Sequence, residues 1–403
     1  MSLGKEKACG IDGKSWHEYG ENLDEKLEEL VKRLKAKRYK PLPAKRVYIP
    51  KNDKETRPLG LPSIEDKIVQ KGIARILSSI YEADFMDFSY GFRVGRSCHQ
   101  ALKSVNDTIM FKPVSYVIEA DIKGFFDNVS HDWMLKFLQV RISDGSLLLL
   151  ICRFLKAGYM ESGLLVRTGQ GTPQGGNLSP MLANIFFHYV LDLWFYKRAR
   201  VRVRGQCYMV RYADDFVCMV QYRQSADELE RMLRERFAQF GLSLHPQKTR
   251  TISFGRYEQQ NAKSQKRKAN TFDFLGFTHY CGQSRTGVFL LGRKTSSGKF
   301  RKACRQMNIW LRQVRSEMSI RQIWRQYSSK LQGHYNYYGV SGNSRKISDF
   351  GYVSIRMLHK WLNRRGQNRV FTWEQLNGYR AYYPLPRPRI VHNFYQPLYS
   401  RRD

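Results

Sequence analysis

The sequence predicts an α+β fold, with strands and helices in its first part and a basic helical region at its end. Short segments rich in β-branched and aromatic residues alternate with turn residues up to about residue 290. Between them, apolar residues recur at the spacing of an α-helix. Beyond about residue 295 the pattern is basic and helical, with Trp and Tyr interleaved. With 403 residues, 42% of them apolar, the chain can bury more than one core, so we expect two or three domains.

The first elements are two helices with a hairpin between them. Residues 21–38 carry leucines at helical spacing and end before Pro41, which predicts an amphipathic helix. Residues 45–62 predict a strand, a polar turn at Asn52 and Asp53, and a return strand. Residues 63–85 begin with Ser and an acidic residue three positions on, and continue with an apolar helical face.

The middle of the chain predicts a sheet with helices. Residues 114–129 contain a β-rich strand, and residues 167–180 form a Gly-rich loop punctuated by Pro that leads into an apolar helix. The run "VRYADDFVCMV" at 210–220 has β-forming residues on both sides of an acidic pair, which indicates a hairpin. Residues 226–240 predict another amphipathic helix.

The acidic pair is the unusual feature of that hairpin. Asp214 and Asp215 stand between two apolar runs, and carboxylates in an apolar setting are costly unless something positive neutralises them. A polar turn is one interpretation and a metal site is the other. A third carboxylate, Asp121, ends the β-rich strand, so three carboxylates could converge on two divalent cations if the strands are neighbours. Two such ions promote in-line displacement at phosphorus, and oxygen ligands favour Mg²⁺.

The charge of the chain is strongly uneven. Lys and Arg total 69 against 35 Asp and Glu, a formal net charge of +34. Residues 261–403 hold 28 of the basic residues and only five of the acidic ones. Such an excess favours a polyanionic partner, with nucleic acid as the first candidate and an acidic membrane surface as the second. The many aromatic side chains, which can stack on bases, add to the nucleic-acid interpretation.

Other classes of protein are not indicated. The N-terminal "MSLGKEKACG" lacks the apolar core of a signal peptide, and the most apolar run, at 146–158, is too short to span a bilayer. The seven cysteines include no CxxC pair, so neither a disulfide framework nor a zinc ribbon is expected. We expect a soluble protein of the cytoplasm with no membrane partner, from a bacterium or else an organelle.

Several motifs together resemble a reverse transcriptase of the group II intron-encoded type. They occur in the family's order over most of the chain. They are "IPKNDKETRPLGLP" at 49–62, "YGFRVGRS" at 90–97, "DIKGFFD" at 121–127, "TPQGGNLSP" at 172–180, "YADD" at 212–215, "GLSLHPQKT" at 241–249 and "FDFLGF" at 272–277.

The resemblance implies a right-hand polymerase architecture. N-terminal and fingers elements would occupy residues 1–113, a palm with an antiparallel sheet and helices residues 114–290, and a helical thumb or maturase (X) domain residues 295–403. The implied activity is RNA-directed DNA synthesis from a DNA or RNA primer on an RNA template, with dNTPs as substrates and an RNA–DNA hybrid as product. The implied partner is a group II intron RNA, whose splicing and retrohoming the protein would assist.

The resemblance also implies the metal and proton-transfer residues. Asp121, Asp214 and Asp215 would bind two Mg²⁺ ions, with Mn²⁺ as a substitute and the Ile122 carbonyl as a further ligand. Lys248 would give a proton to the leaving pyrophosphate, although a solvated lysine is the alternative interpretation.

Nucleotide and nucleic-acid contacts are implied in the same way. Lys51 and Arg57 would hold the triphosphate, and Gln174 and Gly175 would contact the incoming nucleotide and the template base. Phe126 would exclude a 2′-hydroxyl. Arg93 and Arg96 would contact the template, and Phe274, Leu275 and Gly276 would lie near the primer end. The simpler alternatives are core packing for the phenylalanines, structural ion pairs for Arg93 and Arg96, and exposed hairpin residues for Lys51 and Arg57.

The chain departs from the family pattern at both ends. It stops at Asp403 with no Cys/His cluster like that of an HNH endonuclease, so we do not expect it to cleave target DNA. Only nine residues precede "GIDGKSW", fewer than in most relatives. The alternatives to an intron enzyme are a host-adopted reverse transcriptase in repair or phage defence, a non-catalytic RNA-binding maturase, and an RNA-templated RNA polymerase. The complete carboxylate set and Phe126 argue against the last two.

Overall fold

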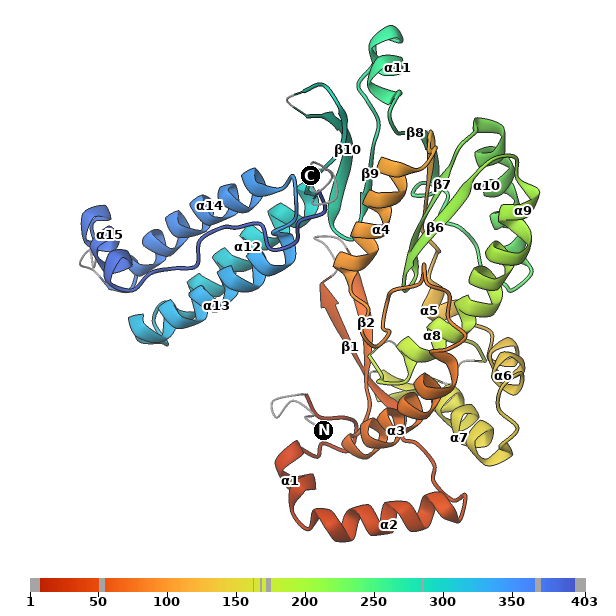
Figure 1. Ribbon diagram of the computed structural model, residues 1–403. Coiled ribbons are helices and arrows are strands. Elements are labelled where there is room, and N and C mark those ends of the chain that lie inside the picture. Colours follow the sequence, from red (N-terminus) through yellow and green to blue (C-terminus); the bar gives the residue numbers. More distant parts are fainter. Residues whose placement is uncertain are drawn as a thin grey trace, which may run out of the picture. The chain divides into compact units, whose positions relative to one another are not determined.

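The computed structural model describes residues 8–50, 55–161, 163–166, 169–171, 175–284, 286–366 and 371–395 (Figure 1). It divides into two compact units. The first unit comprises residues 1–101 and 117–251, and the second comprises residues 102–116 and 252–403. Both contain sheets and helices, so the predicted α+β class is confirmed. The predicted division at residues 113/114 and 290/295 stays a prediction.

The first unit begins with helices and a four-stranded sheet of order β2-β1-β4-β5. The helices are α1 (Trp16–Gly20), α2 (Leu23–Lys35) and α3 (Ile64–Tyr81), and the strands are β1 (Ala44–Pro50), β2 (Thr56–Leu61), β4 (Tyr159–Glu161) and β5 (Leu164–Val166). Strands β1 and β2 pair antiparallel, with Val47 opposite Leu59, so the hairpin predicted over 45–62 is confirmed. Its turn lies outside the described residues.

The two early helices are also confirmed. Helix α2 has its apolar residues along one face, with Leu30 buried. Helix α3 begins at an N-cap, Ser63, whose hydroxyl accepts a hydrogen bond from the backbone N–H of Asp66. Burial raises the pKa of Asp66, and hydrogen bonds from Tyr39, Ser63 and the Leu42 amide to its carboxylate counter that effect.

A second four-stranded sheet has the order β6-β7-β3-β8. Its strands are β3 (Tyr116–Ala120), β6 (Cys207–Tyr212), β7 (Asp215–Val220) and β8 (Arg250–Ser253). Helix α10 (Arg223–Ala238) packs on β7, where the rings of Phe237 and Phe216 lie 6.1 Å apart. The remaining helices of this part are α5 (Phe125–Asn128), α6 (His131–Gln139), α7 (Gly145–Lys156), α8 (Ser179–Phe187), the π-helical turns η1 (His188–Asp192) and η2 (Phe195–Ala199), and α9 (Arg200–Arg202). Helix α4 (Cys98–Phe111) begins in the first unit, and its residues from 102 onward belong to the second.

Aromatic rings form much of the core beneath this sheet. Phe125 stacks on Phe187 at 4.2 Å between ring centroids and meets Phe186 edge-on at 5.9 Å. All three side chains are almost completely buried. Because α5 is only one turn long, this packing rather than helix propensity must fix its position.

The second unit combines a three-stranded antiparallel sheet, of order β11-β10-β9, with a helical bundle. Its elements are α11 (Glu258–Ser264), β9 (Thr271–Phe274), β10 (Phe277–Gln283), β11 (Phe289–Thr295), α12 (Ser297–Val314), α13 (Ile320–Tyr338), α14 (Ser344–Leu362) and α15 (Trp373–Tyr382). Helices α12, α13 and α14 run side by side around a core that includes Leu311, Tyr327 and Leu358 (Figure 1). The predicted helical C-terminal region is therefore confirmed.

Within the part of the chain that the structure describes, no helix is both long enough and apolar enough to cross a lipid bilayer.

Candidate active site

The acidic pair lies at the tip of the β6–β7 hairpin, as predicted. Tyr212 pairs with Asp215, which leaves Ala213 and Asp214 as a two-residue turn. Ala213 has φ of +58°, in the left-handed region that tight hairpin turns require and that residues other than glycine rarely adopt. The sequence thus presents Asp214 on a short, sharply turned backbone.

A neighbouring segment holds this turn from one side. The amide of Tyr90 donates to the carbonyl of Arg211 at 2.9 Å, and the amide of Arg211 donates to the carbonyl of Phe88 at 2.9 Å. A Cβ added to Gly91 would lie 2.3 Å from the backbone nitrogen of Ala213. Only glycine therefore allows this approach, which gives the "YGF" motif a structural reason.

A fully buried arginine fixes the turn from within. Arg211 is 0% exposed and pairs with Asp192, which is also 0% exposed. Its guanidinium donates to the Ala213 carbonyl at 2.9 Å, to the Ser89 hydroxyl at 2.7 Å and to the Asn184 side-chain oxygen at 3.2 Å. Arg211 is not among the residues that the sequence predicted for the site. An arginine inside the apolar run "MVRYADD" was the available signal, because a buried charge requires a partner.

The third carboxylate, Asp121, follows β3 and is joined to residues 243–248. The amide of His245 donates to the Asp121 carbonyl at 2.7 Å, and Ile122 forms an antiparallel bridge with Leu244. This pairing brings Lys248 Nζ to 2.9 Å from Asp121 Oδ2, with both side chains about half exposed. The structure therefore brings together two residues that were both expected at the reaction centre.

The pKa of the Asp214 carboxyl group is raised above its ordinary value. Burial raises its pKa, and the nearby charge of Asp121 raises the pKa further. Its own backbone amide and the charges of Arg57 and Arg211 lower the pKa of Asp214. Arg57, on β2 opposite Ile49, therefore lies near enough to the hairpin tip for its charge to act on Asp214, and its place beside the triphosphate stays a prediction.

The side chains of the acidic residues are of the type that binds a hard cation, but they are not arranged closely enough to hold one. Asp121, Asp214 and Asp215 offer only carboxylate oxygens, which Mg²⁺ prefers. Among the described residues, however, no group of three His, Cys, Asp or Glu side chains is close enough to hold a metal ion. Three carboxylates repel one another, and the Lys248 ammonium takes up one oxygen of Asp121. Asp214, which is half-buried and feels the charge of Asp121, is the feature that a cation would compensate.

Phe126 lies on α5 with its ring half buried. Its neighbour Phe125 is anchored in the core, with the two rings 5.2 Å apart. Gly171 lies against the same short helix, because a Cβ there would be 3.1 Å from the Phe126 carbonyl oxygen. Gly175, with φ of +110°, lies against β2, where a Cβ would come within 2.6 Å of the Gly60 carbonyl oxygen. The Gly-rich loop thus borders both Phe126 and the hairpin that carries Arg57. Lys51 and Gln174 lie outside the described residues.

The two arginines expected on the template differ. Arg93 is nearly buried, pairs with Glu82 at 2.8 Å and donates to the carbonyls of Met86 and Ser89. This favours the alternative of a structural ion pair, because the N–H groups of Arg93 already donate to groups within the folded chain. Arg96 pairs with the exposed Asp87 at 2.8 Å, a contact that a stronger anion could replace.

The residues expected near the primer end lie in the second unit. Phe274 is buried at the end of β9, and Leu275 and Gly276 form the two-residue turn to β10, with φ of +48° and +81°. The hydroxyl of Tyr337 on α13 donates to the Leu275 carbonyl at 3.0 Å, which ties the turn to the helical bundle. Phe274 is therefore packed in the core, and the place of these three residues near the primer end stays a prediction.

Comparison with known proteins gives one family and several relatives. Residues 49–279, more than half of the chain, match the family described as reverse transcriptase (RNA-dependent DNA polymerase). The group II intron-encoded protein LtrA of Lactococcus lactis subsp. cremoris is 46% identical over 175 residues, which cover 42% of this chain and 29% of LtrA. Protein YkfC of Escherichia coli is 35% identical over 240 residues, which cover 53% of this chain and 63% of YkfC. The chain thus spans less than two thirds of either relative.

Solved structures include more distant likenesses. Telomerase from Candida albicans, in complex with a fragment of telomeric RNA, has a TM-score of 0.44 and 14% sequence identity. The match covers 90% of this chain and 65% of that one.

Cation binding at the hairpin tip can be tested by thermal unfolding. At ten times its Kd, a Mg²⁺ ion that binds only the folded protein should add about 1.4 kcal/mol, or roughly 3 °C in Tm. Asp214→Asn should remove most of this increase, because a ligand is lost. In EDTA the same variant should melt at or above the wild-type temperature, since a half-buried charge that is repelled by Asp121 has been removed.

Asp227→Asn is the matched control, because Asp227 is an exposed residue of α10. Its Mg²⁺-dependent increase should equal that of the wild type. An equal increase in Asp214→Asn would exclude Asp214 as a ligand.

Proposed function

The chain belongs to the reverse transcriptase family, and we propose that it is an RNA-directed DNA polymerase that extends a DNA or RNA primer on an RNA template with dNTPs. One observation carries the proposal. Asp214, at the tip of a hairpin held by buried hydrogen bonds, is close enough to both Asp121 and Arg57 for their charges to shift its pKa. Acidic groups and a cation that would bind phosphate thus act on one another near the hairpin tip, which supports nucleotidyl transfer as the reaction.

The proposed chemistry assigns a role to each side chain. Asp121, Asp214, Asp215 and the Ile122 carbonyl would hold two Mg²⁺ ions. Bound ions would supply a more acidic primer 3′-hydroxyl and a counter-charge for the triphosphate. Arg57, with Lys51, would orient the triphosphate, and Gln174 and Gly175 would border the nascent base pair.

Lys248 is proposed to protonate the pyrophosphate that leaves. An ammonium 2.9 Å from Asp121 is held within the site by charge, so it can move from the carboxylate to a developing phosphate oxygen. Without that ion pair, a side chain with so many rotamers would spend little time near the reaction.

The similarity to LtrA favours a group II intron enzyme. LtrA is described as a group II intron-encoded protein, and the shared segment is 46% identical to it. We propose that this chain also binds an intron RNA and assists its splicing and retrohoming, in a bacterial cytoplasm or else an organelle. A host-adopted reverse transcriptase is the second candidate. RNA isolated with the native protein distinguishes the two, because one dominant intron is expected for the first and host RNAs for the second.

Primer extension tests the catalytic proposal. With Mg²⁺, dNTPs and a primed RNA template, the wild type should extend the primer. Asp214→Ala should reduce the rate by at least about 100-fold, since metal binding is lost, and leave the Kd for RNA within about twofold. Asp227→Ala should extend at the wild-type rate. If wild type and Asp214→Ala bind RNA tightly but are equally inert, the chain is a binding maturase rather than a polymerase.

Sugar selection tests the role of Phe126. Its ring is half buried and its backbone carbonyl lies against Gly171 of the Gly-rich loop, so Phe126→Ala should open space for a 2′-hydroxyl and raise ribonucleotide incorporation about tenfold relative to dNTPs. Tyr196→Ala, which removes an exposed ring on η2, is the control and should leave selectivity unchanged. An unchanged ratio in Phe126→Ala would assign the exclusion to another residue.

A further inference from the structure

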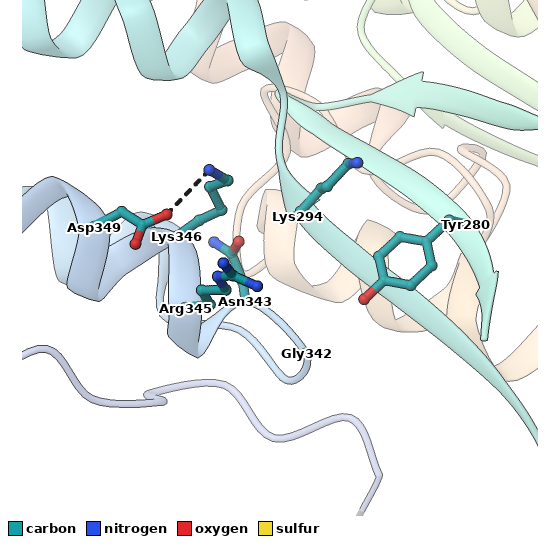
Figure 2. Close-up of a pocket in the computed structure, with 7 residues that line it drawn as sticks. All are labelled: Tyr280, Lys294, Gly342, Asn343, Arg345, Lys346 and Asp349. Carbon is teal, nitrogen blue, oxygen red and sulfur yellow. Dashed lines mark hydrogen bonds and ion pairs between the residues drawn. The ribbon is translucent and has the colours of Figure 1, made fainter. Parts of the chain in front are cut away.

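The second unit contains an open cleft of about 430 Å³ between the β10–β11 hairpin and the start of α14 (Figure 2). Six of its seven lining residues have a polar or charged side chain. The lining residues are Tyr280, Lys294, Gly342, Asn343, Arg345, Lys346 and Asp349.

The cations of the cleft outnumber its acids by three to one. Lys294 is exposed on β11, whereas its neighbours Arg293 and Thr295 are buried, because alternate residues of a strand face opposite sides. Arg345 is exposed in the first turn of α14. Lys346 pairs with Asp349 at 3.0 Å, so one of the three positive charges is balanced (Figure 2).

The other two cations have no such balance. In the part of the chain that the structure describes, neither Lys294 nor Arg345 has a carboxylate within ion-pair distance. Figure 2 shows Lys294 projecting from the strand and Arg345 from the helix start, with the hydroxyl end of Tyr280 nearby. An anion in the cleft would therefore meet charges and a hydroxyl donor that come from two different elements.

Buried hydrogen bonds make the side of the cleft nearest α14 rigid. Asn343 is buried; its side-chain oxygen accepts from the Thr295 amide at 2.8 Å, and its side-chain nitrogen donates to the Tyr338 carbonyl at 2.8 Å. The residue before it, Gly342, has φ of +88°. The loop that leads into α14 is thus fixed to β11.

The position of Tyr280 is fixed as well. It lies opposite Gly292 in the β10–β11 register, and a Cβ on that glycine would be 2.3 Å from the tyrosine ring. The ring therefore lies across the glycine backbone, where another residue type would displace it. A site built in advance loses little entropy when it binds a ligand.

These features together select a phosphate group as ligand. Arg and Lys donors combined with a hydroxyl suit phosphate oxygens, and the planar guanidinium can bind two oxygens at once. The cleft is larger than one phosphate and open to solvent, which suits a segment of a polymer. Residues 261–403, which supply every lining residue, hold 28 basic against five acidic residues, which favours a polyanion over a single nucleotide.

We propose that this cleft is a phosphate-binding site that holds the backbone of an RNA bound by the second unit. The inference rests on the proposed function only in that RNA is taken as the partner. It adds a site at residue level, distant in sequence from the carboxylates, where affinity rather than catalysis is decided.

The test is RNA binding by fluorescence anisotropy with the full chain, without dNTPs, over 50–300 mM KCl. The probe is a fluorescein-labelled RNA hairpin with a single-stranded tail. Lys294→Gln/Arg345→Gln should weaken binding about tenfold and lower the slope of log K against log salt by about 1 to 2, because one or two phosphate contacts are lost. Both side chains are exposed, so the Tm of the variant should equal that of the wild type.

The matched control is Lys263→Gln/Arg321→Gln, which removes the same two charges from exposed positions on α11 and α13 of the same unit. It should change the affinity by less than about threefold. Equal losses in the two double variants would overturn the site, because only net charge would then matter. Tyr280→Phe should lower the affinity slightly if its hydroxyl donates to the phosphate.

Competition separates the two sources of phosphate. Inorganic phosphate or ATP, at matched ionic strength, should displace little RNA at 1 mM. If ATP binding is lost in Lys294→Gln/Arg345→Gln while RNA binding is unchanged, the cleft is a nucleotide site and the proposal is wrong. If the wild type extends primers but both double variants bind RNA equally well, the proposed polymerase function stands and the proposed phosphate-binding cleft is wrong. If Lys294→Gln/Arg345→Gln alone weakens RNA binding but the wild type does not extend primers, the cleft stands and the polymerase function is wrong.

Discussion

The buried ion pair between Arg211 and Asp192 is the interaction on which the candidate site depends. Both side chains are fully buried, and the desolvation of two charges is repaid only when their remaining donors and acceptors are satisfied. Here Ser89, Asn184 and the Ala213 carbonyl satisfy the guanidinium. Removal of one partner from such a pair costs about 3–5 kcal/mol. The pair therefore joins three separate parts of the chain to the turn that carries Asp214.

This constraint explains how an unfavourable arrangement persists. Ala213 adopts a left-handed conformation, which is costly for a residue other than glycine, and partial burial together with the charge of Asp121 raises the pKa of Asp214. The hydrogen bond from Arg211 to the Ala213 carbonyl and the close approach of Gly91 hold the backbone of the turn in this conformation. The free energy of folding thus maintains an acidic site that a divalent cation would relieve. In the second unit, hydrogen bonds of the buried Asn343 similarly fix the loop before α14, beside the exposed cations of the cleft.

Much of this site could be predicted from the sequence, because its signals are local. The hairpin over 210–220 and the β1–β2 hairpin with Arg57 follow from strand pattern and turn chemistry. The partners of Arg211 could not be predicted, since Ser89 and Asp192 are far from it in the sequence. The burial of Arg93 was also hidden, because a charged residue in a motif looks the same whether it faces solvent or Glu82. The cleft could not be predicted either, because only the structure shows that Lys294 and Arg345, far apart in the sequence, line the same cleft.

The most direct test of this account is the extension rate of Arg211→Met/Asp192→Leu. Replacement of both charges by apolar residues avoids leaving one charge unpaired, so the variant should fold with a Tm near that of the wild type. The link to Ala213 is nevertheless lost. We predict that single-turnover primer extension slows by about 100-fold while the Kd for RNA stays within about twofold. A folded double variant that extends primers at the wild-type rate would contradict the account.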